Sequence, residues 1–333
     1  MSDRCLAAFL TVFVVKLLAP TLASAQSMPT RTAWGQPDLQ GVWDFRSITP
    51  LQRPEELADR EFLTEEEAAN LEQATISREE DLLNRPARRT TAGGSVDRGE
   101  DGALGAYNDF WLDRGTTTIG NRRTSLIVDP PNGRMPAMTA EAEKRAAARR
   151  DYRREHPADS WEDRGLNDRC MFTTGLPIVP SAYNNNVQFF QTPDHVAMLI
   201  EMTHTLRVIL LDGRSPSNLS QFVGVSRGHW EGDTLVVETT NFHRLTSLRG
   251  STSNARLLER FTRVGPETIE YEFTVEDPDT WPQPWTAQVE LTKTDEPLYE
   301  YACHEGNYSM EGILAGARAQ ENATAEAGKL REP

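Results

Sequence analysis

Alternating apolar and polar residues dominate the chain from about Val187 onward. Eight runs keep this two-residue period, and turn-forming sequences such as Pro193-Asp194 and Asp212-Gly213 separate them. Antiparallel strands at this spacing form a meander, and closing the meander removes its exposed edges, so we predict a mainly-β, lipocalin-like antiparallel β-barrel of about eight to ten strands over residues 176–317. The runs are VQFFQT, HVAMLIEM, LRVILLD, TLVVETTNF, LLERFTRV, TIEYEFTVED, WTAQVELTK and LYEYACHE.

Positions 26–175 indicate an irregular, partly helical segment that packs on the barrel. Thr64, followed three residues later by Glu67, forms a capping-box pattern that predicts a helix of about fifteen residues. Thr139 precedes an alanine-rich, charged stretch that predicts a second helix on the surface. Residues 86–106 are rich in glycine and lack an apolar period, so we expect a loop there, and we expect a flexible tail over 318–333.

Residues 1–25 are typical of a secretory signal peptide. An apolar run from Leu6 to Leu22 ends in the small residues Ala23, Ser24 and Ala25. This run is shorter than the ~20 residues of a membrane span, so we expect cleavage and no stable membrane insertion, with a retained N-terminal anchor as the alternative. The sequence therefore predicts a periplasmic or secreted protein.

The net charge limits which partners the protein can bind, and the cysteine content predicts its disulfide bonding. The net charge of −15 argues against nucleic acid or anionic lipid as a partner, because both need a basic surface. Cys170 and Cys303 remain after signal removal, and in an oxidising compartment they predict one disulfide. Two unpaired buried thiols are the alternative.

His204 is a candidate acid or base. Alternation puts Val196, Met198, Ile200 and Met202 on one strand face, and His204 shares that face if the strand continues so far. An imidazole on an apolar face needs little tuning to transfer protons near neutral pH. The alternative is a histidine at a hairpin end, bonded to a backbone carbonyl. Glu201 lies on the opposite face, where we expect it to be solvated or paired with Arg207.

Tyr183 and the three asparagines after it directly precede a predicted strand. Three carboxamides in a row are costly to bury without partners, so Asn184, Asn185 and Asn186 are candidates for holding a polar ligand group. The alternative is a capped turn, because asparagine tolerates left-handed backbone geometry.

The sequence YACHEGNY combines several reactive side chains near the end of the chain. On a regular strand, Tyr301, Cys303 and Glu305 share one face and His304 lies on the other, so these groups cannot ligate one metal. We therefore predict no metal site, and Tyr301, Glu305 and His304 stay as acid/base candidates. The chain also lacks the GxSxG, P-loop, HExxH and GxGxxG signatures, which predicts no cofactor.

Several motifs together resemble those of a family of exported bacterial proteins with no established activity. They include PDLQGVWDF, YNNNVQFFQTPDHV, SRGHWEGDTLVVETTNF and YACHEGNY, and the resemblance runs from about Pro37 to Ala317. It implies export but no substrate. At the level of fold, the part from Val187 resembles calycin and lipocalin barrels, and Gly41-Val42-Trp43 is similar to the lipocalin GxW motif.

These observations favour an enzyme that works without a cofactor on a small apolar or aromatic molecule inside the barrel. It would be a lyase, isomerase or hydrolase with His204, His304, Tyr301, Tyr183 and Glu305 as acid/base groups. Asn184, Asn185, Asn186, Met198, Met202, Tyr271 and Phe273 would contact the substrate. The alternatives are a binding protein for a hydrophobic small molecule, or a purely structural protein with a solid barrel interior. The catalytic hypothesis fails if both histidines lie on the outer surface.

Overall fold

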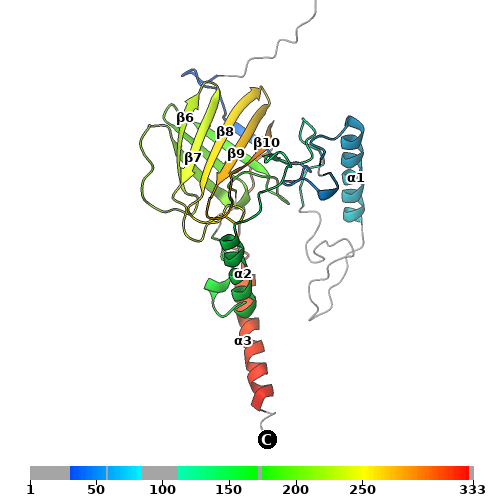
Figure 1. The fold of residues 1–333 in the computed structure, drawn as a ribbon, viewed down its shortest axis with the longest axis vertical. Coiled ribbons are helices and arrows are strands. Elements are labelled where there is room, and N and C mark those ends of the chain that lie inside the picture. The colour runs from blue at the N-terminus through cyan, green and yellow to red at the C-terminus, as the bar shows by residue number, and fades with distance from the viewer. Residues whose placement is uncertain (1–30, 58, 85–111, 172–174, 330–333) are drawn as a thin grey trace, which may run out of the picture.

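The computed structural model describes residues 31–57, 59–84, 112–171 and 175–329 of the chain. Figure 1 shows a β-barrel with helix α1 (Glu65–Asn84) to one side, and with helices α2 (Ala140–Glu155) and α3 (Tyr308–Lys329) extending from one end. The predicted signal peptide and the predicted loop over 86–106 lie outside the described residues. None of the helices in the described ranges combines the length and apolar character that a membrane span requires.

One sheet contains all the strands of the described ranges, and pairing of β1 with β10 closes it. The order around the sheet is β1-β3-β4-β5-β6-β7-β8-β9-β10, with β2 attached beside β10. Neighbours pair antiparallel except β5 and β6, which confirms the predicted mainly-β barrel. The strands are β1 (Gly41–Asp44), β2 (Ile127–Asp129), β3 (Asn186–Gln191), β4 (His195–Ile200), β5 (Thr205–Leu210), β6 (Val225–Glu231), β7 (Thr234–Thr240), β8 (Arg256–Gly265), β9 (Thr268–Glu276) and β10 (Trp285–Thr294).

The inner face of the barrel forms a continuous aromatic core. Phe261 and Tyr271 stack with ring centroids 4.7 Å apart, and Phe273 meets Trp285 edge-on at 5.6 Å. All four side chains are fully buried. Alternation along β9 is the cause, because every second residue from Ile269 to Val275 faces inward as predicted.

A buried ion pair crosses the weakest seam of the barrel. β5 and β6 share a single parallel bridge, between Leu210 and Arg227, whereas neighbouring strands pair over six or seven residues. Arg207 of β5 donates to Glu259 of β8 at 2.6 and 3.1 Å, and also to Ser226 of β6 and Thr239 of β7 at 3.1 and 2.9 Å. Side-chain hydrogen bonds therefore join the strands where backbone pairing is sparse.

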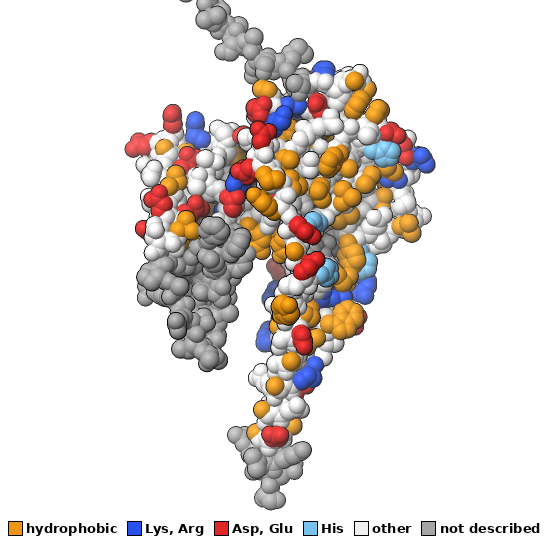
Figure 2. Space-filling model, turned by 180° about the vertical axis from the view of Figure 1, so that it is seen from behind, with side chains coloured by type: hydrophobic (Ala, Val, Ile, Leu, Met, Phe, Trp, Pro, Cys, Tyr) orange, Lys and Arg blue, Asp and Glu red, His pale blue; other side chains and the backbone are white. Residues whose placement is uncertain are grey.

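The outer face of β3, β4 and β5 carries several exposed apolar side chains. Phe190, Leu206 and Val208 point outward and are 47%, 57% and 50% exposed. Figure 2, which views the molecule from behind, shows apolar side chains gathered over the barrel wall. These exposed apolar residues occupy positions where the alternating pattern would place polar ones, yet β3, β4 and β5 still form.

The strand prediction was wrong at two places. LYEYACHE is not a strand: β10 ends at Thr294 and the residues up to Asn307 are irregular, because β1 already pairs with β10 and leaves no strand edge for them. β6 was not among the predicted runs. Its Gly228 interrupts the apolar pattern, and a Cβ there would lie 2.8 Å from the side chain of Ile209, so glycine allows β5 and β6 to approach.

Both N-terminal helices begin where predicted. Thr64 and Glu67 form the reciprocal capping bonds, at 2.8 and 3.2 Å, that start α1, and Thr139 accepts from the N–H of Ala142 at the start of α2. The region boundaries differ from expectation at both ends. β1 comes from the segment expected to be irregular, and helix α3 covers residues where we expected a flexible tail, because alanine and glutamate there favour helix.

Candidate functional site

Polar loops gather at one end of the barrel. β1, β4 and β7 end there, and β3, β5 and β8 begin there. A segment preceding β3 crosses this end: Ile178 is fully buried, and its N–H donates to the Tyr271 hydroxyl at 3.3 Å. Three neighbouring cavities lie around this segment, so the candidate site is at the barrel end.

The first cavity, the barrel-end cavity, has a volume of about 700 Å³. Its apolar wall includes Leu176, Ile178, Ile200 and Met202, and its polar wall includes Arg249. This volume and mixed lining are typical of sites for small organic ligands.

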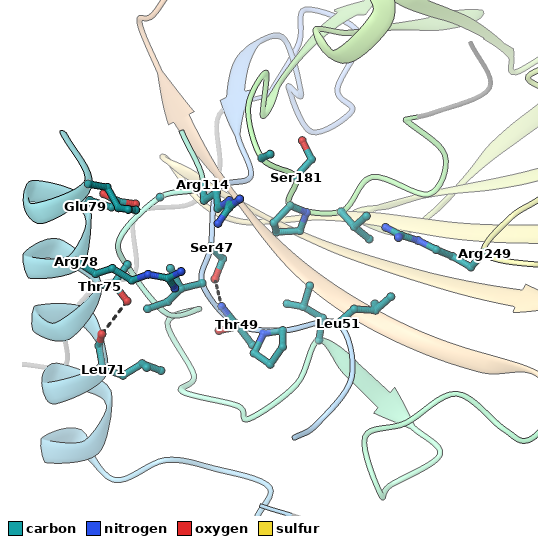
Figure 3. A pocket seen from close by; sticks show the side chains of 18 residues that line it. Ser47, Thr49, Leu51, Leu71, Thr75, Arg78, Glu79, Arg114, Ser181 and Arg249 are labelled. Carbon is teal, nitrogen blue, oxygen red and sulfur yellow. Dashed lines mark hydrogen bonds between the residues drawn. The ribbon is translucent and has the colours of Figure 1, made fainter. Parts of the chain in front are cut away.

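The second cavity, the arginine cavity, has a volume of about 550 Å³ and lies beside α1. Arg78 comes from α1, Arg114 from an extended segment, and Arg249 from the loop after β7, and Figure 3 shows their side chains around the space. Glu79 is the one carboxylate among the described residues that line it. Burial, with a contribution from Asp113, raises the pKa of Glu79 despite the opposing charge of Arg114. The cavity therefore carries an excess of positive charge.

Arg249 is the point at which the two cavities meet. It lines both, together with Val179, Ser181 and Ala182. Within the described ranges Arg249 makes no hydrogen bond or ion pair. Arg249 is exposed, although nearby protein atoms displace part of its hydration and lower the pKa of its guanidinium. The group stays charged at neutral pH and is available to an anionic ligand.

The third cavity, the tyrosine cavity, has a volume of about 950 Å³. Tyr183 and Tyr301 line both this cavity and the barrel-end cavity, and their rings stack with centroids 6.4 Å apart. The stacked pair is therefore a shared wall between two binding-size spaces.

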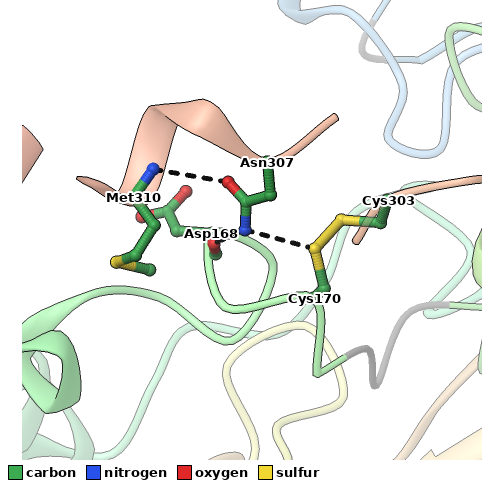
Figure 4. Close-up of a disulfide and its surroundings, with 5 residues drawn as sticks. All are labelled: Asp168, Cys170, Cys303, Asn307 and Met310. Carbon is green, nitrogen blue, oxygen red and sulfur yellow. Dashed lines mark hydrogen bonds between the residues drawn. A yellow bond between two sulfur atoms is a disulfide. The ribbon is translucent and has the colours of Figure 1, made fainter. Parts of the chain in front are cut away.

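The predicted disulfide anchors one side of the tyrosine cavity. Cys170 and Cys303 are joined, and Asn307 donates to the Asp168 carbonyl at 2.9 Å and contacts the sulfur of Cys170 at 3.3 Å (Figure 4). The irregular segment after β10 is thereby tied to the segment preceding β3. It carries Tyr301 into the cavity wall.

The predicted substrate contacts divide into core and cavity residues. Met198, Tyr271 and Phe273 are fully buried in the solid core and line none of the three cavities, so the prediction that they face a ligand inside the barrel was wrong. Met202 lies past the end of β4 and lines the barrel-end cavity. The interior is packed because Phe189 of β3 meets Phe261 of β8 across it, with ring centroids 5.4 Å apart.

Only two of the predicted acid/base groups, Tyr183 and Tyr301, lie together, whereas His204, His304 and Glu305 line none of the three cavities. β4 ends at Ile200, and His204 follows in a 3-10 turn with positive φ, where it is exposed; its Nε2 accepts from the backbone N–H of Tyr301 at 3.0 Å. The alternative prediction, a histidine at a hairpin end, therefore describes the position of His204. Its partner is a backbone N–H and not the expected carbonyl. His304 and Glu305 are also exposed in the irregular segment. Because both histidines lie on the outer surface, the mechanism with inward-facing histidines is excluded.

The three asparagines have different environments. Asn184 has a φ of 55° and fits a turn, while buried Asn185 accepts from the N–H of Ser181 at 2.7 Å and donates to the Asp113 carbonyl at 2.8 Å. Asn186 instead donates to Glu201 at 3.1 Å. All three line the tyrosine cavity. The predicted turn therefore describes Asn184. Asn185 and Asn186 instead form hydrogen bonds that stabilise the cavity wall.

Sequence reasoning missed Arg78, Arg114 and Arg249. Each lies in a segment without strand period, where an arginine is indistinguishable from an ordinary exposed charge. Glu201 was also misplaced, since it is 3% exposed and Arg207 pairs with Glu259. Only the three-dimensional closure of the barrel brings these loops together.

The described residues contain no group of three or more His, Cys, Asp or Glu side chains suited to a metal ion. Comparison with protein-family models, with curated proteins and with solved structures found no match. The resemblance to an exported family is thus not supported by a family match. Fold and cavities define a closed β-barrel protein with a solid interior and ligand-sized cavities at one end, an architecture compatible with small-molecule binding.

Proposed function

We propose that the protein binds a small organic anion with an apolar body, held at the barrel end with its charged group against Arg249. The main support for this proposal is that Arg249 lines two cavities and has no hydrogen-bond or ion-pair partner among the described residues. A carboxylate matches the planar guanidinium in two parallel hydrogen bonds. The apolar body of such a ligand would contact Ile200 and Met202.

The positive charge of the arginine cavity supports a negatively charged ligand. Arg78 and Arg114 lie around the same space as Arg249, and Glu79 is the only carboxylate among the described residues that line this cavity. Asp168 lines the barrel-end cavity and pairs with Arg164 at 2.9 Å. Arg78, Arg114 and Arg249 are all exposed, so their attraction for an anion is screened by solvent and should weaken as salt is added. A fatty or aromatic carboxylate of modest length fits the combined volumes of about 550 and 700 Å³.

Binding without turnover is favoured over catalysis. The enzyme hypothesis needs a histidine close to a tyrosine, glutamate or asparagine inside one cavity, and His204 and His304 are exposed and line none of the three. Arg249 supplies binding and orientation, and it does not exchange protons near neutral pH. We therefore infer a binding protein as the function.

The test is calorimetric titration with octanoate and, as the uncharged match, octan-1-ol. We expect octanoate to bind and Arg249→Met to weaken it by about ten- to a hundred-fold, the range for loss of a charged hydrogen-bonding partner. Arg244→Met is the matched control, because Arg244 is an exposed arginine of the same loop that lines none of the cavities. Equal binding of octanoate and octanol, or an unchanged affinity in Arg249→Met, would contradict the proposal.

We further infer that the protein acts outside the cytoplasm. An apolar N-terminal run ending in Ala23-Ser24-Ala25 and a disulfide between Cys170 and Cys303 support this inference. Cell fractionation with N-terminal sequencing tests it, and the expected mature N-terminus is Gln26. A protein that keeps its N-terminal residues in the cytoplasmic fraction would contradict it.

A further inference from the structure

The tyrosine cavity has the opposite electrostatic character to the arginine cavity. None of the described residues that line it is a lysine, arginine or histidine. Four of them are carboxylates, namely Asp113, Glu201, Glu296 and Glu300. Arg46, outside the lining, binds Asp113 at 2.6 Å and lies 3.5 Å from Glu296, so it compensates the outer pair. The charge that stays uncompensated lies at Glu201 and Glu300.

Glu201 is a buried carboxylate with hydrogen bonds but no counter-ion. It is 3% exposed, and its oxygens accept from the N–H of Tyr299 at 2.9 Å and from the backbone and side-chain N–H groups of Asn186 at 3.2 and 3.1 Å. Among the described residues no cation pairs with it. Burial of a charge that is only hydrogen-bonded is costly, and a ligand cation in the adjoining cavity would offset that cost.

Asn186 supplies a second, independent indication of a ligand. Its side chain is 8% exposed, and its Nδ2 is directed to Glu201, which fixes the orientation of the amide. The remaining Oδ1 is buried and accepts no hydrogen bond from any described residue. Buried acceptors are nearly always satisfied, so a donor added beside Asn186, at the edge of the cavity that it lines, would complete its hydrogen bonding.

Aromatic side chains complete the wall. Tyr183 and Tyr301 stack within 8° of parallel, and Tyr299, which shortly precedes Tyr301 in the sequence, also lines the cavity. The negative face of an aromatic ring attracts an ammonium group, and the attraction adds to that of a nearby carboxylate.

We propose that the tyrosine cavity binds a small organic ammonium ion, with an N–H directed to Asn186 Oδ1 and the positive charge beside Glu201. An amine supplies both the donor and the charge that these two side chains need, and its organic part lies against the tyrosine rings. This site is distinct from the anion site at Arg249 and does not depend on it, although Tyr183 and Tyr301 contribute to the walls of both.

Benzylamine and benzyl alcohol are the probes, because they share a ring and a size and differ in charge at neutral pH. We expect calorimetry to show benzylamine binding at least about ten-fold more tightly than benzyl alcohol. Glu201→Gln should weaken benzylamine binding by about ten-fold or more, and Glu300→Gln by a smaller factor because Glu300 is exposed. Glu270→Gln, on the outer face of β9 and away from the three cavities, should leave the affinity unchanged.

Equal affinities for the two probes, or unchanged benzylamine binding in both Glu201→Gln and Glu300→Gln, would overturn the proposal. If Glu201→Gln fails to fold, Glu300→Gln and the comparison of the two probes still decide the outcome. Arg249→Met should not weaken benzylamine binding, so failure of the anion site and failure of the ammonium site give different results.

Discussion

Replacing Glu259 by glutamine should destabilise the protein more than any single change of a surface charge. The side chains of Arg207 and Glu259 are 1% and 0% exposed, and Arg207 donates to both carboxylate oxygens. Glutamine keeps the shape but removes the negative charge, which leaves a buried guanidinium without a counter-ion. Breaking one side of such a pair costs about 3–5 kcal/mol, so we expect the free energy of unfolding to fall by that amount.

Equilibrium unfolding in urea, followed by tryptophan fluorescence, measures this change. Glu276→Gln is the matched control, because Glu276 binds Arg256 at 2.9 Å on the outer face, where an exposed pair contributes about 0–1 kcal/mol. Tyr271→Phe provides a milder test. It removes the 2.8 Å hydrogen bond to the same carboxylate and the 3.3 Å bond from the N–H of Ile178, and it should cost about 1.5–3 kcal/mol.

A double replacement separates the charge from the packing. Arg207→Met combined with Glu259→Leu should recover most of the stability lost in Glu259→Gln, because well-packed apolar residues often replace a buried ion pair without loss. If Glu259→Gln lowered stability no more than Glu276→Gln does, the buried pair would not hold the seam and the reasoning would be refuted.

Three further predictions concern other parts of the molecule. Replacing Cys170 and Cys303 together by serine should lower the free energy of unfolding by about 2–4 kcal/mol in urea, and an unchanged midpoint would contradict this. Met198→Ala should cost about 2–5 kcal/mol in the same assay but leave octanoate affinity unaltered, whereas weakened binding would place Met198 in the site. A hydrogen bond to Asp159 raises the pKa of His156. The pairing therefore stabilises the fold at pH values below the ordinary histidine pKa, and this stabilisation is lost as the pH rises through the raised pKa. An NMR titration should show that Asp159→Asn lowers the pKa of His156.

The parts of the fold governed by local pattern were predictable from the sequence. Alternation located β9 and its inward residues, and capping at Thr64 and Thr139 located the starts of α1 and α2. The cysteine count and the expected oxidising compartment predicted the disulfide between Cys170 and Cys303, and the structure confirms it.

The candidate site was much less predictable, because it depends on what occupies the barrel. Alternation shows that Tyr271 and Phe273 face inward, but it cannot show whether side chains from opposite strands meet. Here Phe189 of β3 meets Phe261 of β8 inside the barrel. Residues of irregular loops, such as Arg249 and Glu201, acquire their roles only when the barrel end assembles. Sequence patterns had assigned Glu201 to a solvated strand face, yet the segment after β10 covers it.

The position of β1 imposes an order on folding. Val42 pairs with Gln188 of β3 and with Thr294 of β10, so the first strand of the barrel to be synthesised needs the last one to complete its hydrogen bonds. Until β10 emerges, a growing chain keeps two unpaired strand edges, and such edges can pair with other chains. Contacts this distant in sequence also close slowly. The protein therefore has a long interval between synthesis and ring closure, during which its sheet edges need protection.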